Sequence, residues 1–105
     1  MVKKLDGKGF DEVLQAKDSL IVVDFTTDWC PYCKKLAPVI EQIAGEYGDK
    51  IEVYFVNTDE QPELAERYDI MTIPSVFVFQ NGQVAKSAVN PRGKEAVIDL
   101  IFGSN

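Results

Sequence analysis

The sequence predicts an α/β fold in a single domain over residues 1–105, with a mixed central sheet of about five strands flanked by four helices. Two observations carry this prediction. Apolar runs typical of buried strands alternate along the chain with stretches in which apolar residues recur at helical spacing. Farther along, Asn81-Gly82 joins two strand-like runs, as in a β-hairpin. Hydrophobic residues make up 46% of the chain, enough for one core without disulfide staples.

Periodicity and turn signals divide the chain into nine elements. They are a strand over 2–5, a helix over 8–16, a strand over 19–26, a helix over 30–47, a strand over 51–57, a helix over 62–68, strands over 75–80 and 83–88, and a last helix that includes 97–101. The hairpin pairs its strands antiparallel, whereas the earlier connections through helices predict parallel, right-handed crossovers. The first strand should lie at an edge of the sheet.

Local signals define the first two long elements. Asp6 is a good N-cap, and Phe10, Val13 and Leu14 fall at i, i+3 and i+4 of the helix that follows it. The apolar run 20–25 is nearly continuous, which favours a strand covered on both faces.

The helix over 30–47 keeps apolar residues at helical spacing on both sides of Pro38. The proline should therefore kink this helix rather than end it. Residues 51–57 are expected to form a second interior strand, and Pro62 occupies the first turn of the short helix after it. The inward stripe of the last helix consists of Val97, Ile98 and Ile101.

The two cysteines of the chain, Cys30 and Cys33, lie three residues apart between a buried strand and a long helix. Two thiols at this spacing form and break a disulfide with little backbone movement, which indicates two-electron exchange chemistry. Pro31 favours the first helical position, so Cys30 becomes the N-cap. There the free N–H groups and the helix dipole favour a thiolate, and we expect its sulfur to be exposed. Cys33, one turn inside the helix, should be more buried.

Two other interpretations of the cysteine pair remain open. A stabilising disulfide is one, although it would close a very short loop and constrain the unfolded chain little. Half of a zinc site is the other, although structural zinc takes four Cys or His ligands and the chain has no His and no third Cys.

Charge and apolar length exclude several classes of partner. The formal net charge is −6 with a pI near 4.5, which argues against nucleic acid and against an anionic membrane. No apolar run approaches the roughly 20 residues that span a bilayer, and the first residues contain no apolar signal core. We therefore expect a cytoplasmic protein, and nothing in the sequence demands more than a monomer.

The sequence resembles the thioredoxin family over nearly its whole length. The matching motifs, in order and at family spacing, are Val23-Asp24-Phe25, Trp29-Cys30-x-x-Cys33-Lys34, Ala37-Pro38, Asn57-x-Asp59, Ile73-Pro74 and Phe79-x-Asn81-Gly82. Each motif is weak alone, but together they are highly specific. The resemblance implies a thioredoxin-like fold and dithiol exchange through the cysteine pair.

Five positions depart from the family pattern. Thioredoxins typically carry Gly-Pro between the cysteines, whereas Pro31-Tyr32 gives the Cys-Pro-Tyr-Cys pattern seen in glutaredoxins. Thr26 stands where thioredoxins often have a first Trp, and Phe55 stands at the family's buried Lys position. Asn90 replaces a Gly that commonly lines the substrate groove. The downstream residues that help glutaredoxins hold glutathione have no counterpart.

Two residues outside the cysteine motif are candidate catalytic groups. A buried carboxylate at Asp24, in an apolar strand, would have a raised pKa and could accept the proton of Cys33, a role that the resemblance supports. Without the usual Lys partner, because Phe55 replaces it, the pKa of Asp24 should rise further. The resemblance also implies a cis Ile73–Pro74 bond that faces the cysteines.

The resemblance implies a substrate groove around the cysteines. The Ile73 backbone would pair with an extended segment of the substrate, as a small case of strand addition. The residues expected to contact substrate are Trp29, Pro31, Tyr32, Thr72, Ile73, Val89 and Asn90. Acidic residues after the second interior strand, Asp59 among them, are interpreted as a solvated face.

The leading functional hypothesis is a protein-disulfide reductase that acts through Cys30 and Cys33. It needs no cofactor beyond the cysteines, and no glycine-rich motif for a dinucleotide is present, so a separate donor similar to thioredoxin reductase, or glutathione, would supply electrons. Its partners would be disulfide-containing proteins. The alternatives are a glutathione-coupled, glutaredoxin-like oxidoreductase, a redox-silent binding module and a metal-binding module.

Overall fold

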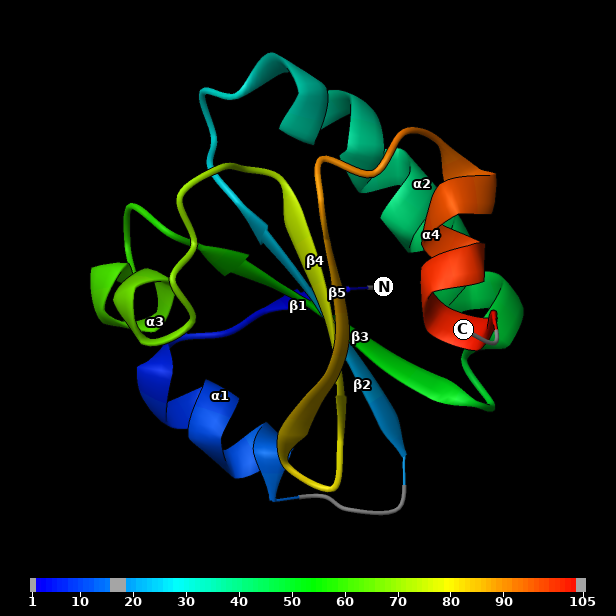
Figure 1. The fold of residues 1–105 in the computed structure, drawn as a ribbon, viewed down its shortest axis with the longest axis horizontal. Coiled ribbons are helices and arrows are strands. Elements are labelled where there is room, and N and C mark those ends of the chain that lie inside the picture. Colours follow the sequence, from blue (N-terminus) through cyan, green and yellow to red (C-terminus); the bar gives the residue numbers. More distant parts are fainter. Residues whose placement is uncertain (1, 16–18, 104–105) are drawn as a thin grey trace.

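A five-stranded mixed sheet runs through the middle of the protein, whose computed structural model describes residues 2–15 and 19–103 (Figure 1). The predicted five strands and four helices are confirmed over these residues. In chain order they are β1 (Lys3–Lys4), α1 (Gly7–Leu14), β2 (Leu20–Thr26), α2 (Pro31–Tyr47), β3 (Ile51–Asn57), α3 (Pro62–Arg67), β4 (Ser75–Gln80), β5 (Gln83–Val89) and α4 (Lys94–Phe102). The expected strand over 2–5 is shorter than predicted, and residue 16 of the expected first helix lies outside the described residues.

The strand order is β1-β3-β2-β4-β5, with β1 at an edge as predicted. The β1–β3 and β2–β3 pairs are parallel, and the β4–β5 hairpin is antiparallel. The prediction of a parallel crossover from β3 to β4 is wrong, because β4 runs antiparallel to β2. The six-residue helix α3 spans only about 9 Å, and the chain re-enters the sheet at the end where β3 finishes, since Asn57 lies opposite Thr26 and Ser75 opposite Phe25.

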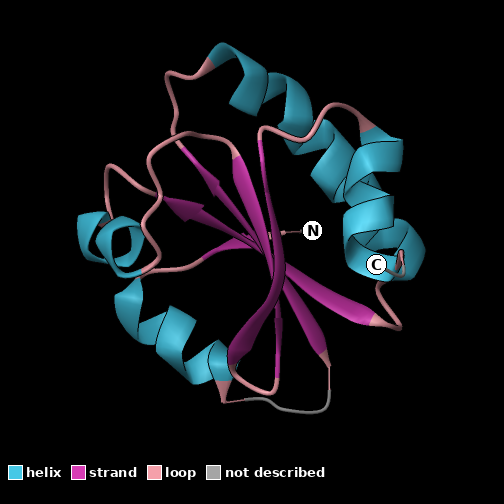
Figure 2. Ribbon diagram, in the orientation of Figure 1, coloured by secondary structure: helices cyan, strands magenta, loops and turns pink. Residues whose placement is uncertain are grey.

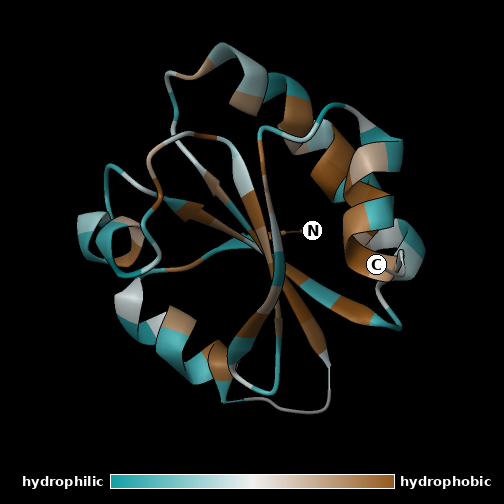
Figure 3. Cartoon of the chain, in the orientation of Figure 1, coloured by the Kyte–Doolittle hydropathy of each residue, from teal (hydrophilic) through white to brown (hydrophobic). Residues whose placement is uncertain are grey.

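Two pairs of helices cover the two faces of the sheet. Figure 2 shows α1 and α3 on one side of the strands and α2 and α4 on the other. Each side has its own apolar core, and in Figure 3 hydrophobic segments concentrate on the strands and on α2 and α4. On the α1/α3 side the buried residues are Phe10, Ile21, Val23, Phe25, Val56, Leu64 and Phe79. On the α2/α4 side they include Val22, Leu36, Ile40, Ile43, Val53, Val76, Val78, Val97 and Ile101.

Side-chain alternation along β2 places Asp24 on the face that α2 covers. Val22 belongs to the α2/α4 core, whereas Val23 and Phe25 belong to the α1/α3 core. Because successive residues of a strand point to opposite faces, Asp24 shares the face of Val22. Its partner in the parallel register is Phe55 on β3. A single carboxyl group is thus set into the apolar layer beneath the cysteine-bearing helix.

The start of α2 follows from Cys30 and Pro31. Cys30 has extended backbone angles and is the N-cap, and Pro31 takes the first helical position, as predicted. Pro38 lies inside the helix, which continues to Tyr47, so the expectation that this proline does not end the helix is confirmed. The cysteine pair is therefore fixed at the helix terminus where unpaired backbone N–H groups gather.

Candidate active site

The sulfur of Cys30 caps the first turn of α2. Its Sγ atom accepts a hydrogen bond from the backbone N–H of Cys33, with a donor–acceptor distance of 3.3 Å. This contact occupies one of the N–H groups that a helix N-terminus leaves without an internal partner. The positive end of the helix dipole also lies here, so the position favours negative charge on sulfur.

Both cysteines are free thiols, and their burial differs in the predicted order. Cys33 keeps 2% of its surface exposed and Cys30 keeps 7%. The expectation that Cys30 is well exposed is therefore wrong. The reason is its capping role, in which the side chain folds back over the helix terminus. Burial, with a smaller contribution from the neighbouring Cys30, raises the pKa of the Cys33 thiol, while Thr26 and Thr27 oppose the rise.

Asp24 is fully buried, as its apolar strand predicted. Burial raises the pKa of its carboxyl to about 8. Neither carboxyl oxygen has a hydrogen-bond partner among the described residues, so no direct hydrogen bond joins Asp24 to either cysteine. Proton exchange between Asp24 and a thiol would therefore have to pass through water.

The peptide bond between Ile73 and Pro74 is cis, as the resemblance implied. Pro74 is buried, Ile73 is half-buried and Thr72 is exposed. The Ser75 hydroxyl donates to the Thr72 carbonyl over 2.5 Å, which closes the turn before β4. The structure thus presents a short, ordered loop with two accessible residues before a buried proline.

Asn90 joins the proline loop to the segment between β5 and α4. Its backbone N–H donates to the Pro74 carbonyl over 2.7 Å. Its φ of 54° lies in the left-handed region, which glycine adopts freely and asparagine tolerates. The family's usual glycine at this position is therefore replaced by one of the residues best able to keep the same backbone. Its side-chain Oδ1 is buried without a partner among the described residues.

Tyr32, between the cysteines, is anchored to the same segment. Its hydroxyl donates to the Pro91 carbonyl over 2.8 Å and accepts from the Gly93 N–H over 3.1 Å. The Arg92 guanidinium lies over its ring, 4.5 Å from the ring centre. Tyr32 therefore ties the start of α2 to residues 91–93, a contact that the sequence did not predict.

Two of the residues expected to contact substrate are exposed apolar side chains. Trp29 is 65% exposed and Val89 is 63% exposed. The Trp29 indole N–H donates to Asp59 over 2.7 Å, so that Asp59, interpreted from sequence as part of a solvated face, orients the tryptophan. Met71, 92% exposed and two residues before Ile73, was not singled out by the sequence.

Sequence distance explains which contacts were missed. Asp59 lies 30 positions from Trp29, and Pro91 lies 59 positions from Tyr32. Neither pair carries a local signal, although Asp59 belongs to one of the family motifs. Among residues 2–15 and 19–103, no group of three or more His, Cys, Asp or Glu side chains could hold a metal ion.

The lengths and hydropathy of the helices show whether any of them could cross a membrane. No helix within the described part of the chain combines the length and the apolar character needed to cross a bilayer.

Comparison with known proteins identifies a family. The thioredoxin family profile matches residues 1–102. A thioredoxin from Rickettsia bellii is 35% identical over 101 residues, covering 96% of both chains, and one from Bacillus subtilis is 35% identical over 96 residues, covering 90% of this chain and 92% of the relative. An M-type chloroplast thioredoxin from Spinacia oleracea is 38% identical over 100 residues, which are 95% of this chain but 55% of the relative. The chain thus spans about half of that plant relative and nearly all of the two bacterial ones.

Proposed function

Since the chain belongs to the thioredoxin family of thiol–disulfide oxidoreductases, we propose that it reduces disulfides of other proteins through Cys30 and Cys33. The observation that carries the proposal is the position of the Cys30 sulfur, which caps α2 and accepts the Cys33 N–H over 3.3 Å. This position favours a thiolate, the nucleophilic form of cysteine.

In the first step, the Cys30 thiolate attacks one sulfur of the substrate disulfide. A bond forms between the Cys30 sulfur and that sulfur, and the substrate S–S bond breaks. The second substrate sulfur leaves with the electron pair and takes a proton. The small exposed fraction of Cys30, 7%, supports a reaction in which the substrate approaches from one side.

In the second step, Cys33 attacks the sulfur of Cys30 in the mixed disulfide. The Cys30–Cys33 disulfide forms, the reduced substrate leaves as a thiolate, and the two electrons lost by the cysteines now reside on the substrate. Cys33 must give up a proton to react, and burial raises the pKa of its thiol. We assign Asp24 as the group that exchanges this proton through water. With a pKa of about 8 its carboxyl is mostly protonated at neutral pH, and the ionised fraction is the form that accepts the proton.

The residues around the cysteines are proposed to position the substrate. The backbone of Ile73, beside Pro74, would pair with an extended segment that carries the disulfide. Trp29, Pro31, Thr72 and Val89 are exposed and would contact its side chains, whereas half-buried Tyr32 and Asn90 would hold the shape of the groove.

Each turnover leaves Cys30 and Cys33 oxidised, so a separate donor must return two electrons. Family members receive them from thioredoxin reductase, and we propose a donor of this type. Pro31-Tyr32 favours glutathione as an alternative donor, because this dipeptide occurs in glutaredoxins. If glutathione reduces the oxidised protein faster than a thioredoxin reductase does, glutathione is the donor.

The reductase direction suits a reducing compartment, so we propose a cytoplasmic site of action. We also propose that residues 1–105 act as one domain and as a monomer, since the cysteine pair, Asp24 and the proline loop all come from a single sheet and one covering helix.

The decisive experiment has two parts. The wild type should reduce a model protein disulfide such as insulin in the presence of dithiothreitol, whereas Cys30→Ser should show only the background rate. In native extract, Cys33→Ser should trap mixed disulfides through Cys30 that dithiothreitol releases. Equal rates for the wild type and Cys30→Ser would instead support a redox-silent binding module.

A further inference from the structure

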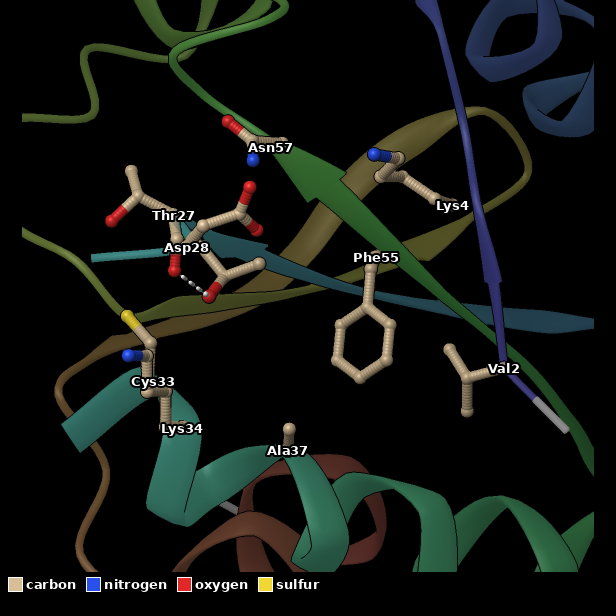
Figure 4. Close-up of a pocket in the computed structure, with 10 residues that line it drawn as sticks. Val2, Lys4, Thr27, Asp28, Cys33, Lys34, Ala37, Phe55 and Asn57 are labelled. Carbon is tan, nitrogen blue, oxygen red and sulfur yellow. Dashed lines mark hydrogen bonds between the residues drawn. The ribbon is translucent and has the colours of Figure 1, made fainter. Parts of the chain in front are cut away.

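A pocket of about 340 Å³ opens between the first half of α2 and the edge of the sheet formed by β1 and β3 (Figure 4). None of the exposed residues proposed to contact substrate lines it, although Cys33 forms part of its wall. The lining residues are Val2, Lys4, Thr26, Thr27, Asp28, Cys33, Lys34, Ala37, Phe55 and Asn57.

Two departures from the family pattern meet in this pocket. Thr26 stands where thioredoxins often have a tryptophan, and Phe55 stands where they carry a buried lysine; both side chains line the cavity. A larger side chain at position 26 would extend into the space that the threonine leaves open. The cavity is thus a consequence of residues particular to this sequence.

One wall of the pocket is apolar. In Figure 4 the Phe55 ring extends from β3 toward Ala37 on α2, and Val2 lies beside it. Val2 belongs to the α2/α4 core and Phe55 packs against that core, so this wall is well supported. A cavity of this size with an apolar wall and a few polar groups is typical of small-molecule sites.

Asn57 supplies a directed donor on the opposite wall. The residue is 97% buried, with 3% of its surface exposed. Its Oδ1 accepts from the N–H groups of Asp59, over 2.9 Å, and Glu60, over 3.2 Å. The side-chain nitrogen is therefore turned into the pocket, as Figure 4 shows, and it donates to none of the residues that the structure describes. An acceptor on a bound molecule would satisfy it.

Some of the charged side chains that line the pocket form ion pairs and others do not. Lys4 forms an ion pair with Glu60 over 2.9 Å, and Asp28 also acts on Lys4. Lys34, on the other side of the pocket in Figure 4, has no ion pair within residues 2–15 and 19–103. Lys34 and the Asn57 amide are thus the two donors left among the described residues for a ligand that carries negatively charged oxygen atoms. The Asp28 carboxylate also lines the pocket, but it faces only Lys4, which is already paired with Glu60.

We propose that this pocket binds a small carboxylate with an apolar body. The body would lie against Phe55 and Ala37, and the carboxylate oxygens would accept hydrogen bonds from the Asn57 amide and the Lys34 ammonium group. The volume suits a molecule of about ten non-hydrogen atoms, for which binding in the millimolar range or tighter is expected.

The test is an NMR titration of the full reduced chain with phenylacetate as the probe. Saturable shifts should appear at the Asn57 side-chain amide and at the backbone amides of Thr26 and Lys34. Lys34→Gln should weaken binding at least threefold, and the matched control Lys35→Gln, which changes the neighbouring exposed lysine, should leave it unchanged. Neutral phenylacetamide should bind at least threefold more weakly than phenylacetate.

A substitution that fills the pocket provides a second line of evidence. Thr26→Trp should abolish the shifts, and Ala37→Leu should weaken binding if the tryptophan variant does not fold. Shifts confined to other surfaces, no saturation, or equal binding by wild type and Lys34→Gln would overturn the proposal. Because binding is measured without disulfide exchange, failure of the proposed reductase function would leave this result standing.

Discussion

Replacing Asp24 with asparagine should make the protein more stable at neutral pH and remove a pH dependence. Burial raises the pKa of this carboxyl from 3.8 to about 8 in the folded protein. Between these values the folded chain holds a proton that the unfolded chain has released. Stability therefore falls as pH rises, by about 1.4 kcal/mol per pH unit for one group. Asparagine has nearly the same shape and cannot ionise.

The magnitude follows from the two pKa values. Between pH 5 and pH 7.5 the wild type should lose about 3 kcal/mol of unfolding free energy through this residue, and Asp24→Asn should lose none of that amount. The other titrating groups are common to both proteins, so their contributions cancel in the comparison.

Urea unfolding of both proteins, reduced throughout, at pH 5 and pH 7.5 provides the measurement. The control is Asp69→Asn, which removes an exposed carboxyl at a left-handed position that asparagine tolerates, and it should keep the wild-type pH dependence. Identical pH dependence in Asp24→Asn and the wild type would refute the reasoning, since it would mean that Asp24 ionises alike in the folded and unfolded chains.

Three further predictions concern the neighbourhood of the cysteines. Phe55→Lys places a cation beside Asp24, its register partner, and should lower the pKa of Asp24 below about 8; NMR titration of the carboxyl carbon checks this, and an unchanged midpoint would contradict it. Tyr32→Phe removes two hydrogen bonds and should destabilise the protein by about 1–3 kcal/mol while raising KM for protein disulfides more than it changes kcat. Tyr54→Phe, which removes a hydroxyl bonded to the half-buried Glu52, far from the cysteines in sequence, is its matched control. The reduction potential, measured against glutathione buffers, should lie between about −270 and −230 mV, and a value more negative than that of thioredoxin would exclude the proposed effect of the Pro-Tyr dipeptide.

Local signals predicted those features that depend on neighbouring residues. Strands β3 and β4 have the predicted bounds, and the Asn81-Gly82 turn joins β4 to β5. Asp6 caps α1 by accepting the Gly9 N–H over 2.7 Å, as its position before the apolar periodicity indicated. Each of these features is encoded within a few residues, so a single sequence suffices to find it.

Features that depend on distant parts of the chain were predicted less well. The direction of β4 depends on its pairing with β2, about 50 residues earlier in the chain. The burial of Cys30 is local, but no residue pattern predicts it, because it depends on how the side chain folds over the helix end. The contact of Tyr32 with Pro91 joins residues that lie 59 positions apart in the sequence. The cis bond before Pro74 was predicted only through the family resemblance, because most X–Pro bonds are trans.

The two cysteines differ in environment in the way that the proposed reaction order requires. The Cys30 sulfur accepts a backbone N–H at the start of α2 and keeps more exposed surface than Cys33, so it should attack first. Burial raises the pKa of Cys33, which keeps this thiol protonated until the mixed disulfide forms. The second step then needs a group whose pKa is close to neutral pH. Asp24 has a pKa of about 8 because it is buried on the face that α2 covers, and it has no hydrogen-bond partner among the described residues. A carboxyl that weakens the fold near neutral pH is thus explained by the step in which the resolving thiol loses its proton.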